Sequence, residues 1–176
     1  MDFLPSESFM VDLSGLSQEE WNALSQALGT VVVKWNLVEH LLDYCVAIIY
    51  HNCGGKSIVK QDKNKVPRFM ESKANYLKNC LEKLDILLPY KDEGLLLVKR
   101  SSDLSKERND MIHMRLMGKN PDGSFLFDKL DHKAMHESRM LPYTINQFHQ
   151  FGTKILDLAE DLGQFCKRLQ QQFVCP

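Results

Sequence analysis

The residues whose types and spacing could carry out chemistry lie in one run, Arg108 to His113. On an α-helix, where successive residues turn by ~100°, Asn109 and His113 share a face one turn apart, and Arg108 lies ~140° around from His113. Histidine exchanges a proton near neutral pH, and a guanidinium can neutralise phosphate oxygens with two parallel hydrogen bonds. The run therefore indicates chemistry on a phosphodiester. His113 would move a proton, Arg108 would stabilise the negative charge of the transition state, and Asn109 would orient His113 or a phosphate oxygen.

A purely structural role for the same run is the alternative. Arg108 would then pair with Glu107 or Asp110, Asn109 would face solvent, and His113 would be a hydrogen-bonded core or interface histidine.

Glu39 lies among apolar residues in the middle of the first expected helix. A carboxylate is costly to bury there unless it meets a cation, and we expect Arg108 to be that cation. The alternative is an exposed Glu39 on the same polar strip as Asp43.

Residues 56 to 78 carry seven basic and two acidic side chains, a local excess of +5 in a chain whose formal net charge is −1. Such a stretch is typical of a solvated loop and helix face. It could also supply phosphate contacts, for which Lys63, Lys65 and Arg68 are the candidates.

Metal and cofactor chemistry find little support in the sequence. His132 and His136, with Glu137, could bind a metal if that stretch were helical, but a third ligand is not identifiable and an irregular loop is the favoured interpretation. The five cysteines are odd in number and form no C-x-x-C pair, which argues against a disulfide framework or a thiolate zinc site. The common nucleotide, hydrolase and metalloprotease motifs are lacking, so we expect neither a metal nor a cofactor.

The elements that must position the run are helices. Ser17 to Glu20 has the form of a capping box, and the helix that it begins should end at Gly54-Gly55. Apolar residues follow at steps of three and four: Leu24, Leu28, Val31, Trp35, Val38, Leu42, Cys45 and Ile49. A second stripe beside the first (Leu37, Leu41, Tyr44 and Ile48) predicts that this helix is covered by its own bundle and by another subunit.

Three more helices are expected. Pro67 suits the first turn of the second, which should end before Pro89. The third should run from about 92 to 116, with Leu97, Leu104 and Met111 seven residues apart, the Arg-Asn-His run in its last two turns and Gly118 as its stop. Turn formers at 119 to 124 precede Phe125-Leu126-Phe127 and predict a short hairpin or ordered loop. Thr144 to Gln147 forms a second capping box, which begins the last helix.

At 176 residues the chain fits one domain, with a core of about 17–172 and an N-terminal extension at 1–16. We expect an all-α, antiparallel four-helix bundle with the hairpin or loop between helices 3 and 4. The start of the chain lacks a basic region followed by an apolar core, and no apolar run reaches ~18 residues, so a cytoplasmic protein without a membrane span is the expectation.

The run from Arg108 to His113, late in the third of four helices, resembles the signature of the HEPN family, in which arginine is followed by a polar residue such as asparagine and then by histidine. The resemblance covers roughly residues 18 to 172. It implies a metal-independent endoribonuclease that acts on RNA as a homodimer, with the motifs of two subunits facing each other across one cleft. A role as a toxin or defence component, with an antitoxin or other protein partner, belongs to the same expectation.

One residue departs from the family pattern: Met114 stands where a small residue often follows the histidine. This departure and the near-neutral charge favour an alternative of the same fold. In it, the chain is a catalytically inactive dimerisation module that binds a nucleotide or another ligand through Arg108 and His113.

Overall fold

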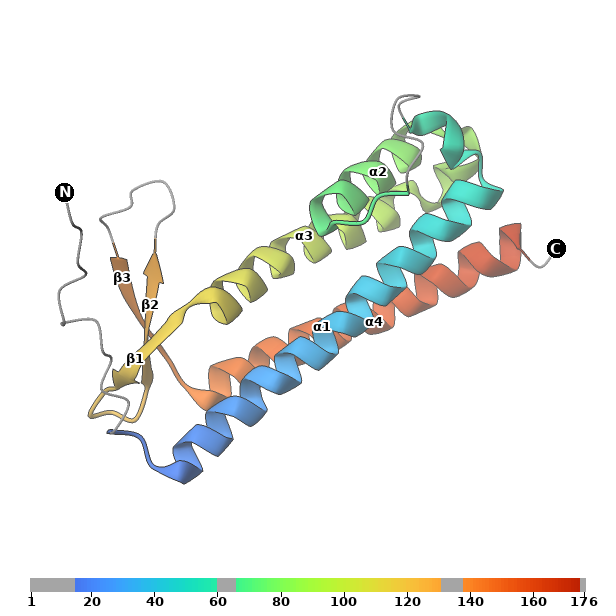
Figure 1. Cartoon of the computed structure of the whole chain (residues 1–176). Coiled ribbons are helices and arrows are strands. Elements are labelled where there is room, and N and C mark those ends of the chain that lie inside the picture. Colours follow the sequence, from blue (N-terminus) through green and yellow to red (C-terminus); the bar gives the residue numbers. More distant parts are fainter. Residues whose placement is uncertain (1–14, 60–65, 131–137, 175–176) are drawn as a thin grey trace, which may run out of the picture.

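The computed structural model describes residues 15–59, 66–130 and 138–174. Its four helices are α1 (Gln18–Asn52), α2 (Met70–Lys83), α3 (Lys91–His113) and α4 (Ile145–Phe173) (Figure 1). Two short 3-10 turns, η3 (Gly55–Ile58) and η5 (Asp85–Tyr90), follow α1 and α2. Four helices were expected, and the sequence patterns locate all of them.

Capping boxes begin the two longest helices, as predicted. The Glu20 backbone N–H donates to the Ser17 hydroxyl at 3.2 Å, and the Ser17 N–H donates to the Glu20 carboxylate at 2.8 Å. Thr144 and Gln147 form the same pair of contacts at the start of α4. Each box satisfies two backbone donors that the first helical turn leaves without a partner. At the other end of α1, Gly54 has φ 82°, the left-handed conformation expected of the stop.

The antiparallel arrangement predicted for the bundle is wrong for α1 and α4, which run parallel (Figure 1). The side-chain amide of Asn52, at the end of α1, donates to the carbonyl of Phe173 at the end of α4 (3.3 Å). Nearer the middle of both helices, the Cys166 thiol of α4 donates to the carbonyl of Leu41 of α1 (3.4 Å). Helix α3 runs in the opposite direction, so the connection from α3 returns the chain to the end of the molecule where α1 begins.

That connection holds a sheet, which an all-α fold lacks. Its strands β1 (Arg115–Lys119), β2 (Phe125–Leu130) and β3 (Ser138–Tyr143) pair antiparallel in sequence order. The hairpin between β1 and β2 confirms the expectation for residues 119 to 127, whereas β3 was not predicted. Lys119 forms an ion pair with Glu20, which fastens the hairpin to the first turn of α1.

Two helix boundaries also differ from the predictions. Helix α3 ends at His113 rather than near Leu116, because the chain enters β1 directly, and the predicted stop Gly118 lies within that strand beside a bulge. Helix α2 begins at Met70, three residues after Pro67. The α2–α3 pair packs closely at Gly94, where an added Cβ would lie 2.8 Å from the Leu81 methyl carbons.

The core lies mainly between α1 and α4. Its largest fully buried side chains include Trp35, Leu42, Ile49, Phe148, Phe151, Ile155, Leu158, Leu162 and Leu169. In α3, Leu97 and Met111 are buried and Leu104 is partly buried, at the predicted interval of seven residues. None of the helices in the described ranges has a stretch long and apolar enough to cross a membrane.

Candidate functional site

The predicted site residues lie in the last two turns of α3, as expected. Arg108 is half-buried and donates from Nη1 to the Asn109 side-chain oxygen at 2.9 Å. Asn109 and His113 are exposed, and His113 is the last residue of the helix. Within the described part of the chain, His113 forms no hydrogen bond or ion pair. The fold therefore brings Arg108 and Asn109 together and leaves the imidazole open to solvent.

Arg108 forms no ion pair with any residue that the structure describes. The two carboxylates that could neutralise it locally are bound elsewhere: Glu107 pairs with Lys154 of α4 at 3.3 Å, and Asp110 pairs with Lys129 of β2 at 2.7 Å. The Nε atom of Arg108 is buried and has no hydrogen-bond partner among the described residues. A buried donor without an acceptor is costly, so this N–H group would be stabilised by any acceptor oxygen brought into contact with it.

Glu39 does not meet Arg108, and that predicted ion pair is wrong. The Glu39 carboxylate is half-buried and accepts a hydrogen bond from the indole N–H of Trp35 at 2.8 Å. Its polar neighbour Asp43 pairs with Lys73 of α2 at 2.6 Å. Glu39 therefore satisfies a buried donor on its own helix.

The basic residues between 56 and 78 differ in their burial and in their partners. Lys73, only 6% exposed in its side chain, joins α2 to α1 through Asp43. Arg68 is exposed just before α2. The predicted phosphate contacts Lys63 and Lys65 lie outside the described residues, as do His132, His136 and Glu137 of the metal hypothesis. Elsewhere in the described ranges, no three histidine, cysteine, aspartate or glutamate side chains gather as a metal site would require.

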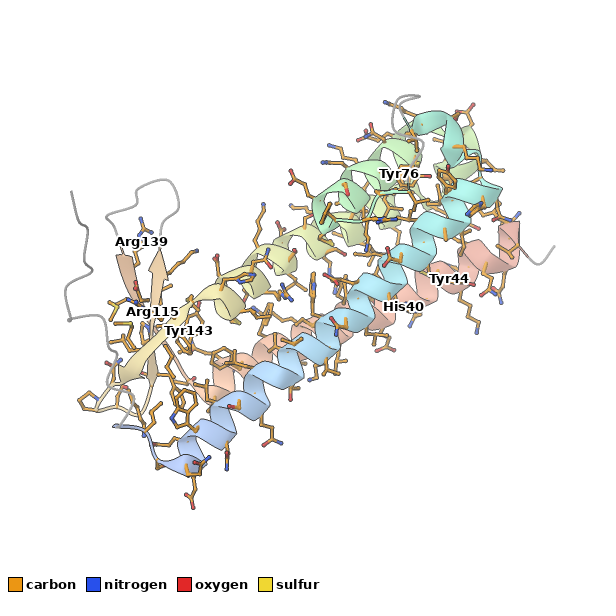
Figure 2. The ribbon with its side chains drawn as sticks, viewed as in Figure 1. His40, Tyr44, Tyr76, Arg115, Arg139 and Tyr143 are labelled. Carbon is orange, nitrogen blue, oxygen red and sulfur yellow. The ribbon has the colours of Figure 1, made fainter. Side chains whose placement is uncertain are left out.

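The sheet that follows α3 adds basic side chains that the sequence did not single out. Arg115 and Arg139 are exposed on β1 and β3 (Figure 2). Arg115 pairs with Asp128 at 3.0 Å, and that carboxylate is 4% exposed. Because Arg115 follows His113 by two residues, the end of α3 leads directly into a basic strand. The sequence pattern predicted a helix to about residue 116, so it gave no sign that Arg115 begins a strand.

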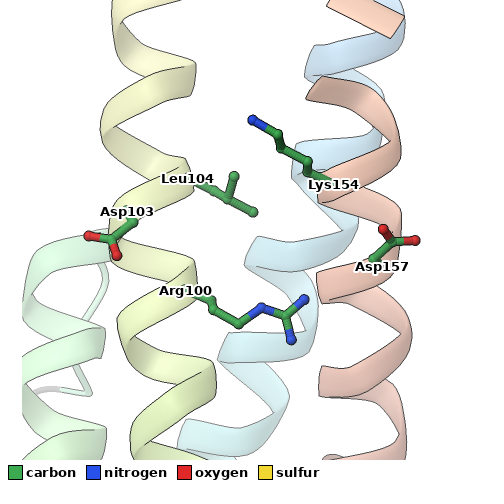
Figure 3. Close-up of a pocket in the computed structure, with 5 residues that line it drawn as sticks. All are labelled: Arg100, Asp103, Leu104, Lys154 and Asp157. Atoms are coloured by element: carbon green, nitrogen blue, oxygen red, sulfur yellow. The ribbon is translucent and has the colours of Figure 1, made fainter. Parts of the chain in front are cut away.

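Two hollows lie along the contact between α3 and α4. The larger, about 270 Å³, is lined by Arg100, Asp103, Leu104, Lys154 and Asp157. Arg100 and Leu104 point from α3 toward α4, and Lys154 points from α4 toward α3, whereas Asp103 lies on the outer side of its helix (Figure 3). Arg100 also pairs with Asp161 at 2.5 Å. The cations of this hollow are thus engaged in ion pairs between the helices.

The smaller hollow, about 200 Å³, lies between Glu107 of α3 and the first turns of α4. Its lining comprises Glu107, Met111, Tyr143, Gln147, Gln150, Phe151 and Lys154. Burial, with the nearby charges of Asp110 and Glu107, raises the pKa of the Tyr143 hydroxyl. The Tyr143 ring packs edge-on against Phe127. Neither Arg108 nor His113 lines either hollow.

The arrangement can bind an anion more readily than it can position a proton transfer within one subunit. Arg108 offers a guanidinium that no described carboxylate pairs with, and His113 offers an accessible imidazole on a different side of the same helix. Comparison of the chain with protein-family models, with curated proteins and with solved structures gives no match.

Proposed function

We propose that this chain is a metal-independent endoribonuclease of HEPN type that acts as a homodimer. The observation that carries the proposal is the state of Arg108. Among the described residues its guanidinium has no ion-pair partner and its Nε has no acceptor, and lysines from other elements hold the carboxylates of Glu107 and Asp110. A phosphate oxygen supplies both the negative charge and the acceptor that this side chain lacks.

The division of roles follows from the chemistry of each group. His113, accessible at the end of α3, takes or gives the proton when the RNA 2′-hydroxyl attacks its own phosphate. Arg108 stabilises the charge that gathers on the phosphate oxygens in the transition state. Asn109 holds the Arg108 guanidinium through its side-chain oxygen and keeps its amide N–H groups for a phosphate oxygen.

The geometry of one helix supports the proposal of a second subunit. Arg108 and His113 lie ~140° apart around α3, so a single helix does not present both to the same phosphate. Two copies of α3 facing each other would bring the Arg108 of one subunit to the His113 of the other. The exposed Arg115 and Arg139 would extend the basic surface along which RNA enters.

The direct test is incubation of the purified protein with single-stranded RNA in excess EDTA. We expect cleavage that leaves 2′,3′-cyclic phosphate ends, and a loss of at least about 100-fold in rate for both His113→Ala and Arg108→Ala. His149→Ala, which removes an exposed histidine of α4, is the matched control and should cleave at the wild-type rate. Cleavage that persists in both site variants would end the assignment. A strictly monomeric protein at micromolar concentration would remove the shared cleft.

A second candidate is an inactive module of the same fold that binds a phosphate-bearing nucleotide. It is favoured by one observation: His113 has no hydrogen bond to Asn109 or to any other described residue that would orient its ring. This candidate predicts no cleavage but a rise in melting temperature with added nucleotide. The rise should vanish in Arg108→Ala and persist in His113→Ala, a pattern that the enzyme hypothesis does not share.

A further inference from the structure

Two buried thiols meet at the interface between α1 and α4. The sulfur atoms of Cys45 and Cys166 lie 2.6 Å apart. The two residues are 1% and 2% exposed, so the pair is enclosed by the core. Cys166 also donates to the carbonyl of Leu41 at 3.4 Å, which holds its thiol in place against α1.

We propose that Cys45 and Cys166 form an oxidisable pair, which a peroxide converts into a disulfide bond that joins α1 to α4. In the balanced reaction, two thiols and one hydrogen peroxide give one disulfide and two water molecules. One sulfur is first oxidised to a sulfenic acid, which releases water, and the second sulfur then displaces hydroxide from it. The proton of each thiol leaves in the water.

The placement of the pair makes this bond readily attainable. A covalent S–S bond is about 2.05 Å long, so the sulfurs need to approach by only a fraction of an ångström. No helix has to move past another, because the sulfur atoms of the two residues already lie in contact across the α1–α4 interface. The residues are 121 positions apart, so the bond would close a long loop and restrict the unfolded chain strongly.

The surroundings of the pair also determine its rate of reaction. The hydrogen bond with Cys166, together with burial, raises the pKa of the Cys45 thiol well above its ordinary value. Since the thiolate is the reactive form, oxidation should be slow at neutral pH and should depend on transient opening of the core. The pair would therefore respond to sustained oxidation rather than to a brief exposure.

The test treats the full, folded chain with hydrogen peroxide and then counts thiols after denaturation. We expect the number of titratable thiols to fall from five to three, and the linked peptide to weigh two hydrogen atoms less than the sum of its two reduced peptides. Peptide mapping without reduction should recover the Cys45 and Cys166 peptides linked, and this readout needs no variant. The oxidised chain should also unfold at a higher urea concentration than the reduced chain.

Cys45→Ala and Cys166→Ala should each abolish the link, whereas Cys80→Ala, which removes another fully buried thiol, should leave it unchanged. Five titratable thiols after prolonged treatment would overturn the proposal. So would a link that maps to Cys53 and Cys80, or oxidation of either sulfur to a sulfinic acid without a link. RNA cleavage is not measured in any of these assays, so this proposal and the proposed function can fail separately.

Discussion

Helix α4 contacts its two neighbours through seams of opposite character. Against the parallel α1 it presents an apolar seam of fully buried side chains, including Ile155, Leu158 and Leu162. Against the antiparallel α3 it presents three ion pairs: Glu93–Arg168, Arg100–Asp161 and Glu107–Lys154. The first seam excludes water, and the second encloses the two hollows.

The ion pairs of the α3–α4 seam recur at intervals of seven residues on both helices, and their charge alternates along each helix. A slip by one heptad would place Arg100 opposite Lys154 and Glu93 opposite Asp161. Like charges would then face each other, so the ladder selects one register of α3 against α4. The apolar seam therefore supplies stability. The charged seam fixes the register of α3 against α4, and with it the position of the site residues along α4.

The largest expected effect is on the apolar seam. Leu158→Ala removes a side chain with no solvent exposure and should lower the free energy of unfolding by about 2–5 kcal/mol. Leu156→Ala, on the same helix but 42% exposed, is the control and should cost under about 0.5 kcal/mol. Urea unfolding measures both. Equal losses would mean that the outer face of α4 is covered in solution, as by a second subunit.

Reversing the charged seam should have a smaller effect. The triple variant Glu93→Lys, Arg100→Glu, Glu107→Lys opposes like charges at all three positions, and it should cost about 1–3 kcal/mol, because exposed pairs contribute at most ~1 kcal/mol each. Reversing Lys154, Asp161 and Arg168 as well should restore most of the loss. High salt should shrink the difference. If the six-fold variant is no more stable than the triple variant, the ladder does not set the register.

On α1, the Glu39 carboxylate accepts a hydrogen bond from the indole N–H of the buried Trp35. Glu39→Ala leaves that donor unsatisfied and should cost about 1–2 kcal/mol, whereas Glu39→Gln keeps an acceptor and should cost less. Thermal unfolding distinguishes the two variants. The Arg108→Ala background provides a further test: the cost of Glu39→Ala should be unchanged there, since the residues form no ion pair. A smaller cost in that background would restore the coupling that the sequence suggested.

The last effect is confined to alkaline pH and is absent near neutrality. The pKa of the Cys45 thiol is raised in the folded protein, so the folded state keeps a proton that the unfolded state loses above its pKa of about 8.5. Stability from this thiol is fully present below that pH and declines above it, by up to about 1.4 kcal/mol per pH unit. Urea unfolding at pH 8 to 10 under reducing conditions should show a shallower decline for Cys45→Ala. An identical slope in the variant would contradict this.

Local patterns predicted the helices well and their pairing poorly. The capping boxes at Ser17 and Thr144 and the seven-residue spacing of Leu97, Leu104 and Met111 depend on contacts within one helix, which the sequence states directly. The end of α3 was placed about three residues too far, because a strand begins where helical spacing still continues. Strand β3 was missed because it contains Pro142, a residue that disfavours strands. It also follows β2 only after residues 131 to 137 in the sequence, too wide a spacing to be recognised as a two-residue hairpin.

The sequence by itself determined that helices form, which faces of them are apolar, and that Arg108, Asn109 and His113 share the last turns of one helix. Only the tertiary structure decided that α4 runs parallel to α1, that Cys45 meets Cys166, and that lysines from α4 and β2 occupy both carboxylates beside Arg108. The physical reason is the range of the interactions. Helix periodicity records neighbours three and four residues apart, whereas partners many residues away depend on the direction in which each connection returns the chain.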